Sequence, residues 1–245
     1  MNAFTTQGII KESWKLFKIH WGILVSAILS VTVVNIAFSI LSESEGVTGV
    51  IMSIISMFVG LLLQIGLVRL SLNVVDGKPV ALHNLVDEYQ SLLKVFVAWV
   101  LYSVAVIVGL LLLIVPGIII AIMFSQYTYL IVDRRAGVIE SLKLSAALTK
   151  GHKLKLFGFF FVILGVILLG VLALGIGLLV AIPVVTVAGA IVYRRLFGAY
   201  EGVSAVQAET QETPAAPAPF VPLEQDETPA SPEQKEVTQE EKEQQ

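Results

Sequence analysis

Three histidines are the side chains best suited by type to hold a metal ion. His20, His83 and His152 lie in or beside short amphipathic segments in different parts of the chain, and a three-histidine site would need all three to converge. The chain has no cysteine, which excludes thiolate ligands, disulfides and cysteine nucleophiles. No HExxH, nucleophile-elbow, phosphate-loop or dinucleotide motif occurs. We therefore expect no catalytic residue, no metal and no cofactor, and a protein that is not an enzyme.

A second set of candidate residues consists of uncharged polar side chains inside long apolar runs. Such side chains either bond across helices or line a cavity. The densest cluster, Ser125-Gln126-Tyr127-Thr128-Tyr129, is more typical of an aromatic belt with helix-packing hydroxyls than of a polar cavity. If a cavity exists, the residues expected to line it are Asn35, Gln64, Ser125, Gln126 and Thr128.

The composition indicates that these residues are embedded in a membrane. Of 245 residues, 56% are hydrophobic and 14% are charged, against roughly 45–50% and about 25% in soluble proteins. Residues 1–200 carry fourteen Lys/Arg and eight acidic residues, whereas residues 201–245 carry eleven acidic residues and two lysines. The basic part suits anionic lipid headgroups rather than nucleic acid, because its charges are spread over short loops.

Four apolar runs have lengths that fit membrane crossings. About 20 helical residues cross a ~30 Å hydrocarbon core, and Trp21–Leu41 and Val47–Val68 each have that length. Val95–Val132 and Leu156–Tyr193 hold 38 uncharged residues each, so each must fold back. The sequence predicts an all-α polytopic protein with six transmembrane helices in three hairpins. No ionisable residue lies inside any of these spans, which argues against an ion-coupled transporter.

Proline and glycine mark the two reversals. Pro116-Gly117 lies near the middle of the third run, and proline suits the first turn of a returning helix. In the last run we favour Gly175-Ile176-Gly177 over Pro183, because a turn at Pro183 leaves too short a return.

Basic residues set the expected orientation, with both termini in the cytoplasm and the protein in a prokaryotic plasma (inner) membrane. All fourteen basic residues of positions 1–200 fall on one side: Lys11, Lys15, Lys18, Arg69, Lys78, Lys94, Arg134, Arg135, Lys143, Lys150, Lys153, Lys155, Arg194 and Arg195.

A short segment with helical periodicity precedes each hairpin, and we expect each to be an amphipathic helix at the cytoplasmic membrane surface. The expected apolar stripes are Ile10/Trp14/Phe17/Trp21, Leu82/Leu85/Val86/Tyr89/Leu93 and Val138/Leu142/Ala146. The candidate membrane-surface contacts are Lys11, Lys15, Lys18, Arg134, Arg135, Lys143, Lys150, Lys153 and Lys155.

Each helix-plus-hairpin unit resembles the others, over residues 8–71, 78–132 and 134–197. Glu12–Leu16 recurs as Glu140–Leu144, and Asp76-Gly77 enters the second unit as Asp133-Arg134 enters the third. We interpret these as three copies in one orientation, although similar lipid surroundings alone can produce such similarity.

Residues 201–245 have low hydrophobicity and high charge, so we expect a disordered cytoplasmic tail after a membrane domain of residues 1–200. The proline-rich island Pro214–Leu223 is either a docking motif for a protein partner or a solvated spacer.

Residues 133–197 carry a pattern shared by bacterial multi-span proteins. Its parts are Glu140–Ser145, Leu148–Lys153, Leu174–Leu178, Pro183 and Tyr193-Arg194-Arg195. This pattern resembles the membrane domain attached to some glycerophosphoryl diester phosphodiesterases and the related uncharacterised YciC-like integral membrane proteins. In the fused proteins a separate soluble domain carries the catalysis, so the resemblance implies a membrane domain and transfers no catalytic residue.

The expected function is that of a non-enzymatic, membrane-embedded scaffold whose tail recruits a protein partner and whose basic face contacts anionic headgroups, with no nucleic acid. The alternative is a transporter or lipid-handling protein without ion coupling through intramembrane charges. An intramembrane enzyme has only the histidines to support it.

Overall fold

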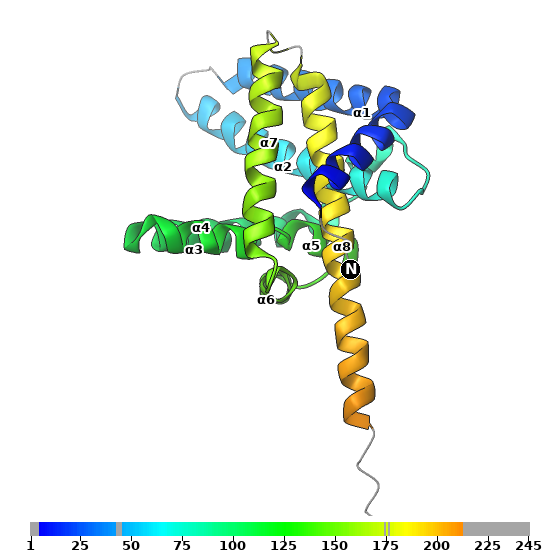
Figure 1. The fold of residues 1–245 in the computed structure, drawn as a ribbon. Coiled ribbons are helices and arrows are strands. Elements are labelled where there is room, and N and C mark those ends of the chain that lie inside the picture. Colours follow the sequence, from blue (N-terminus) through cyan, green and yellow to red (C-terminus); the bar gives the residue numbers. More distant parts are fainter. Residues whose placement is uncertain (1–4, 43–45, 174, 176, 213–245) are drawn as a thin grey trace, which may run out of the picture. The chain divides into compact units, whose positions relative to one another are not determined.

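The computed structural model describes residues 5–42, 46–173, 175 and 177–212, and every regular element in this part of the chain is a helix (Figure 1). The elements are α1 (Thr6–Ser42), α2 (Val47–Val75), the 3-10 turns η1 (Leu82–Leu85) and η2 (Tyr89–Ser91), α3 (Leu92–Leu112), α4 (Ile114–Met123), α5 (Tyr127–Arg134), α6 (Val138–Thr149), α7 (Lys153–Leu172) and α8 (Leu178–Glu212). Within these described residues, six helical stretches are long and apolar enough to cross a membrane, counting η2 with α3 and α4 with α5. The predicted all-α, multi-pass architecture is confirmed.

Both predicted reversals lie where proline and glycine placed them. Leu113 is extended (φ −167°, ψ 151°) between α3 and α4, and Pro116 follows in the first turn of α4. Gly175 has φ 76°, a backbone conformation that favours glycine, and it separates α7 from α8. Pro183 lies inside α8 instead of at the turn.

The three segments that precede the hairpins differ from one another. The first joins the first span at His20, whose non-helical backbone (φ −111°, ψ 19°) divides α1 into two helical parts at a kink. The third is the separate helix α6. The expected second amphipathic helix is wrong: Leu82–Leu93 forms η1, η2 and only the start of α3.

Close contact with α2 accounts for the irregular second segment. A Cβ added at Gly66 of α2 would lie 2.2 Å from the carbonyl oxygen of Leu85, so η1 rests directly on the backbone of α2. This backbone-to-backbone approach needs glycine at position 66, and the irregular segment makes it at Leu85, the last residue of η1.

Two helix boundaries also differ from the prediction. Helix α2 continues past Arg69 to Val75, and α8 continues past Tyr193 to Glu212. Residues 201–212 are therefore helical, and the expected disordered tail can start no earlier than residue 213. The island Pro214–Leu223 lies outside the described residues.

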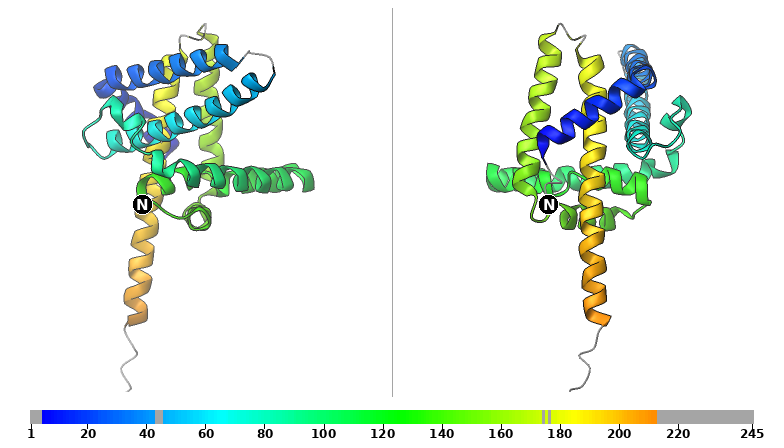
Figure 2. Two further views of the ribbon diagram at one scale, coloured as in Figure 1. Left: turned by 180° about the vertical axis from the view of Figure 1, so that it is seen from behind. Right: turned by 45° about the vertical axis from the view of Figure 1, so that its right-hand side comes forward.

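The helices of the unit that ends at Ala205 pack mainly as pairs. In Figures 1 and 2, α1 lies beside α2 and α3 lies beside α4, while the α3–α4 pair crosses α7. The fully buried side chains include Leu70 and Leu72 of α2, Leu130 and Ile131 of α5, and Tyr193 of α8. These fully buried side chains lie near the C-terminal ends of α2 and α5 and in the middle of α8.

Candidate functional site

The best-defined polar site is an ion-pair network that we call the Arg194 network: Asp76, Asp133, Tyr193 and Arg194. Arg194 donates from Nε and Nη2 to the two carboxylate oxygens of Asp76, at 2.7 and 2.6 Å. It also donates from Nη1 and Nη2 to the two oxygens of Asp133, both at 2.7 Å. One guanidinium therefore holds two carboxylates in bidentate geometry, the strongest form of this contact.

Three hairpins supply the residues of the network. Asp76 caps the C-terminal end of α2, Asp133 is near the C-terminal end of α5, and Tyr193 and Arg194 belong to α8. Tyr193, fully buried, donates its hydroxyl to Asp133 at 2.8 Å. The side chains of Asp133 and Arg194 are 9% and 24% exposed, so the network is largely shielded from solvent.

A second cluster lies around Glu88, whose side chain is only 3% exposed. Arg69 of α2 pairs with it at 3.3 Å, and Arg135, the residue after α5, pairs with it at 3.6 Å. Arg69 also donates to the carbonyl of Val132, and Arg135 donates to Gln90 at 2.8 Å. The Glu88 cluster (Arg69, Glu88, Arg135) fixes the irregular second segment against α2 and α5.

Two more ion pairs extend these contacts. Arg195 of α8 pairs with Glu12 of α1, and Arg134 pairs with Glu201 at 3.2 Å. Arg134 also lies 4.3 Å above the ring of Phe197. Both ion pairs join side chains of different helices, α8 to α1 and α8 to α5.

The candidate membrane-surface contacts divide into two kinds. Arg134 and Arg135 are about half exposed and form the ion pairs just described. The lysine side chains Lys11, Lys15, Lys18, Lys143, Lys150, Lys153 and Lys155 are exposed. On α1, Trp14 and Trp21 are also exposed, and Ile9, Ser13 and Phe17 form the buried face instead.

The five candidate cavity residues fall at different places. Asn35 and Gln64 line one cavity of about 570 Å³ between α1, α2 and α3, together with Phe96 and Trp99. Asn35 Nδ2 donates to the carbonyl of Val31 at 2.8 Å. The structure thus brings together two of the polar residues that the sequence singled out.

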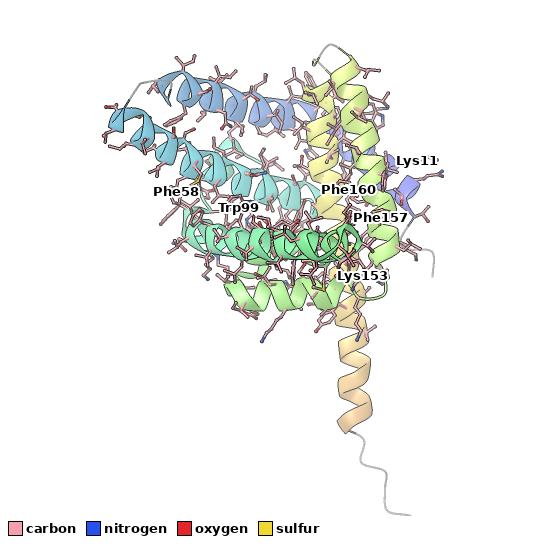
Figure 3. The ribbon with its side chains drawn as sticks, turned by 90° about the vertical axis from the view of Figure 1, so that its left-hand side faces the viewer. Lys11, Phe58, Trp99, Lys153, Phe157 and Phe160 are labelled. Carbon is pink, nitrogen blue, oxygen red and sulfur yellow. The ribbon has the colours of Figure 1, made fainter. Side chains whose placement is uncertain are left out.

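Ser125 and Gln126 line a second cavity, of about 410 Å³, against α4 and α7. Thr128, the second residue of α5, lines neither of these two cavities. Figure 3 shows the aromatic side chains near both: Phe58 and Trp99 by the first, and Phe157 and Phe160 on α7 by the second.

The break between α4 and α5 occurs within this polar cluster. Ser145 of α6 donates to the carbonyl of Met123 at 2.9 Å and accepts from the backbone N–H of Gln126 at 3.1 Å. Thr149 also donates to Met123, at 3.2 Å. Helix α6 therefore satisfies the backbone groups that the break exposes, a requirement at membrane depth. The face of α6 that carries Ser141, Ser145 and Thr149 is buried, whereas Val138 and Ala146 of the expected apolar stripe are half-buried.

The histidines do not converge. His20 lies at the kink of α1, His83 pairs with Asp87 at 3.6 Å, and His152 lies 3.3 Å from the carbonyl of Lys150. Within the described residues, no three His, Asp or Glu side chains form a group that could hold a metal ion.

Sequence reasoning missed the Arg194 network, although one signal pointed to it. The predicted repeat aligned Asp76 with Asp133, and both carboxylates contact Arg194. In addition, Ile131-Val132-Asp133-Arg134-Arg135 and Ile191-Val192-Tyr193-Arg194-Arg195 differ at a single position. Corresponding span ends therefore meet in one place.

Comparison with known proteins adds one finding. A family model described as "Protein of unknown function (DUF975)" matches residues 98–199, from α3 into α8. No curated protein and no solved structure matched the chain. The matched region is similar to an uncharacterised family, and it contains Asp133, Tyr193 and Arg194 but not Asp76.

Proposed function

We propose that the protein is a non-enzymatic scaffold of a prokaryotic plasma membrane, with both termini in the cytoplasm. The Arg194 network carries this proposal, because it joins the ends of three hairpins into one fixed base. Helix α8 contributes Arg194 to that base and continues to Glu212, directly before the acidic residues 213–245. In this proposal the membrane domain is an anchor and the tail recruits a protein partner through Pro214–Leu223.

Exposed lysines support a basic surface toward anionic headgroups. Lys11, Lys15 and Lys18 precede the kink of α1, Lys143 lies on α6, and Lys150 directly follows α6. The resemblance to the membrane domain of glycerophosphoryl diester phosphodiesterases belongs to the same proposal: this chain would share that domain and not the catalytic one.

Affinity purification from native membranes in a gentle detergent tests the scaffold role. The full-length protein is compared with a 201–245 deletion and with a variant whose residues 214–223 are scrambled at constant composition. We expect a stoichiometric protein partner that is lost from both variants. Retention of that partner by the deletion would refute recruitment by the tail, and retention by the scrambled variant alone would make the island a spacer.

The alternative, a transporter or lipid-handling protein, is favoured by the cavity that contains Asn35 and Gln64. The chain has no native cysteine, so single cysteine replacements at these two positions give a clean test. Labelling by a membrane-impermeant thiol reagent would support a water-filled cavity. Protection of both positions from either side of the membrane would count against it.

A further inference from the structure

The cavity between α1, α2 and α3 has a polar wall, and we call it the Gln64 cavity. Ser56, Gly60 and Gln64 follow one another at intervals of four residues, so they share one face of α2 and extend over about 12 Å of that helix. Asn35 of α1 lies against this stripe, with its side-chain oxygen 3.3 Å from the position that a Cβ at Gly60 would take. Glycine at position 60 therefore allows two helices to present three polar side chains to one space.

Two of these side chains have no partner within the chain. Ser56 and Gln64 make no side-chain hydrogen bond to any other described residue. An amide both donates and accepts, so Gln64 stays open to a partner whichever way its amide is turned. Other hydroxyl groups of the apolar helices each donate to a carbonyl of their own helix, namely those of Ser26, Ser30, Thr32, Ser53, Ser71 and Thr186.

The wall that α3 contributes is aromatic. Phe96 contacts both Phe58 and Trp99, with ring centroids 5.2 and 6.4 Å apart, and Phe96 and Trp99 line the cavity. The side chain of Trp99 is 47% exposed. The cavity thus combines hydrogen-bonding groups from α1 and α2 with flat apolar surface from α3.

These two walls restrict the chemistry of a ligand. The described residues that line the cavity include no Asp, Glu, Lys, Arg or His, so a charged group would lose its hydration without gaining a counter-charge. A purely apolar chain would leave Ser56 and Gln64 unpaired, and water alone would leave the aromatic rings in contact with water. A neutral polyol meets both demands. Its hydroxyls donate and accept at the rim, while the C–H groups of its ring lie against an aromatic face.

We propose that the Gln64 cavity binds a neutral polyhydroxylated group, such as a hexose, carried on a membrane lipid or free in solution. Asn35, Ser56 and Gln64 bond to its hydroxyls, and Trp99 packs against its ring. The volume of about 570 Å³ lies within the range of small-molecule sites, about 300–1,000 Å³. This inference rests on the transporter or lipid-handling alternative, whose ligand class it names, and does not involve the tail.

Photo-labelling of the purified full-length protein in phosphatidylcholine nanodiscs tests the site. Three probes carry the same photoreactive diazirine next to the glycerol: a glucosyl-diacylglycerol, a diacylglycerol without sugar, and a phosphatidylglycerol. The glucosyl probe should label at about 100-fold lower concentration than the sugar-free probe, the value of three hydrogen bonds at about fivefold each. The phosphatidylglycerol probe should label no better than the sugar-free one. Labelled peptides should fall within residues 31–35, 56–67 and 96–99.

Competition by methyl glucoside identifies the source of the polyol. If an excess of methyl glucoside removes labelling by the glucosyl probe, the cavity accepts the free polyol. If labelling is unchanged, the cavity takes only the form carried on a lipid. Both results support a neutral polyol as the ligand, because the preference over the sugar-free probe is established first.

Matched variants test the two walls. Gln64→Leu and Ser56→Ala should each lower the preference for the glucosyl probe by about fivefold. The control for the second is Ser53→Ala, which removes a hydroxyl that already donates to Gly49 in α2 and should keep the full preference. Trp99→Leu should weaken labelling by the glucosyl probe and leave labelling by the sugar-free probe unchanged.

Equal labelling of the wild-type protein by the glucosyl and sugar-free probes would overturn the proposal, as would labelled peptides outside the cavity. Both readouts use the wild-type protein, so they decide the question even if a variant fails to fold. Equal labelling together with thiol labelling of Asn35→Cys and Gln64→Cys would refute the polyol and leave the transporter alternative standing. The 201–245 deletion should lose the protein partner and retain the preference, which separates this cavity from the scaffold role.

Discussion

Arg194 is the residue on which most of the polar structure depends. A guanidinium offers five N–H donors in a rigid plane. Here Arg194 donates four hydrogen bonds, two to the carboxylate of Asp76 and two to that of Asp133. An ammonium group has the same charge but cannot reproduce two bidentate contacts. The geometry, as well as the charge, therefore requires arginine at this position.

Replacement of Arg194 by alanine should destabilise the protein strongly. It leaves Asp76 and Asp133 close together without their cation, and loss of one partner from a buried ion pair costs about 3–5 kcal/mol. Arg194→Lys should fall between alanine and the wild type. Unfolding in a mild detergent measures these differences.

Two comparisons control this prediction. Lys78→Ala removes a second partner of Asp76. The Lys78 side chain is 58% exposed, so this change should alter stability by less than about 1 kcal/mol. Replacement of the whole charged set by Asp76→Leu, Asp133→Leu and Arg194→Met should recover most of the loss, because no unpaired charge remains. A single Arg194→Ala variant as stable as Lys78→Ala would contradict the role of the network.

At the scale of the helix, α6 supports the break in the fourth span. Ser145→Ala should destabilise the protein by about 1–3 kcal/mol, because it leaves the Gln126 N–H without its partner and leaves Met123 O with the weaker contact to Thr149. Hydrogen exchange at residues 124–127 should accelerate. The matched control is Ser141→Ala, since Ser141 donates only to Val138 within its own helix and its loss should be small. Equal effects of the two variants would argue against support of the break by α6.

The contact between α2 and η1 gives a second prediction at this scale. Gly66→Ala places a methyl group 2.2 Å from the carbonyl oxygen of Leu85, so it should displace η1 and lower the unfolding midpoint. Gly165→Ala is the control, because nothing lies within 4 Å of its Cβ position. In a helix interior that change should be neutral or stabilising by up to about 1 kcal/mol. An unfolding midpoint of Gly66→Ala at or above that of Gly165→Ala would refute the close contact.

The hairpins could be predicted because length, charge and turn chemistry are local properties. Pro116 and Gly175 mark the reversals regardless of the neighbouring helices. The second amphipathic segment could not be predicted, since its form depends on Gly66 in another helix. Local reasoning could not predict the Arg194 network either, because Asp76 and Asp133 precede Arg194 by 118 and 61 residues. In addition, basic residues at the ends of spans are already expected from the rule that sets loop orientation, so they do not by themselves indicate a network.

At the scale of the whole molecule, the uneven distribution of basic residues predicts the orientation. In a chain without native cysteine, Leu113→Cys lies at the exposed turn between α3 and α4, and Lys150→Cys is expected on the opposite, basic side. An impermeant maleimide added to intact spheroplasts should label Leu113→Cys only. Lys150→Cys should react after the membrane is opened, and the reverse pattern would invert the topology.

The position of Arg194 also has a consequence for biosynthesis. Asp76 leaves the ribosome 118 residues before the cation that neutralises it, a delay on the order of 10 s at ordinary rates of translation. Asp133 follows 61 residues before Arg194, and until Arg194 is made the cations available to these two carboxylates are their chain neighbours Lys78 and Arg134. Insertion of the last hairpin therefore completes the network, and a nascent chain that ends before Arg194 presents two carboxylates without their shared guanidinium to membrane proteases and chaperones.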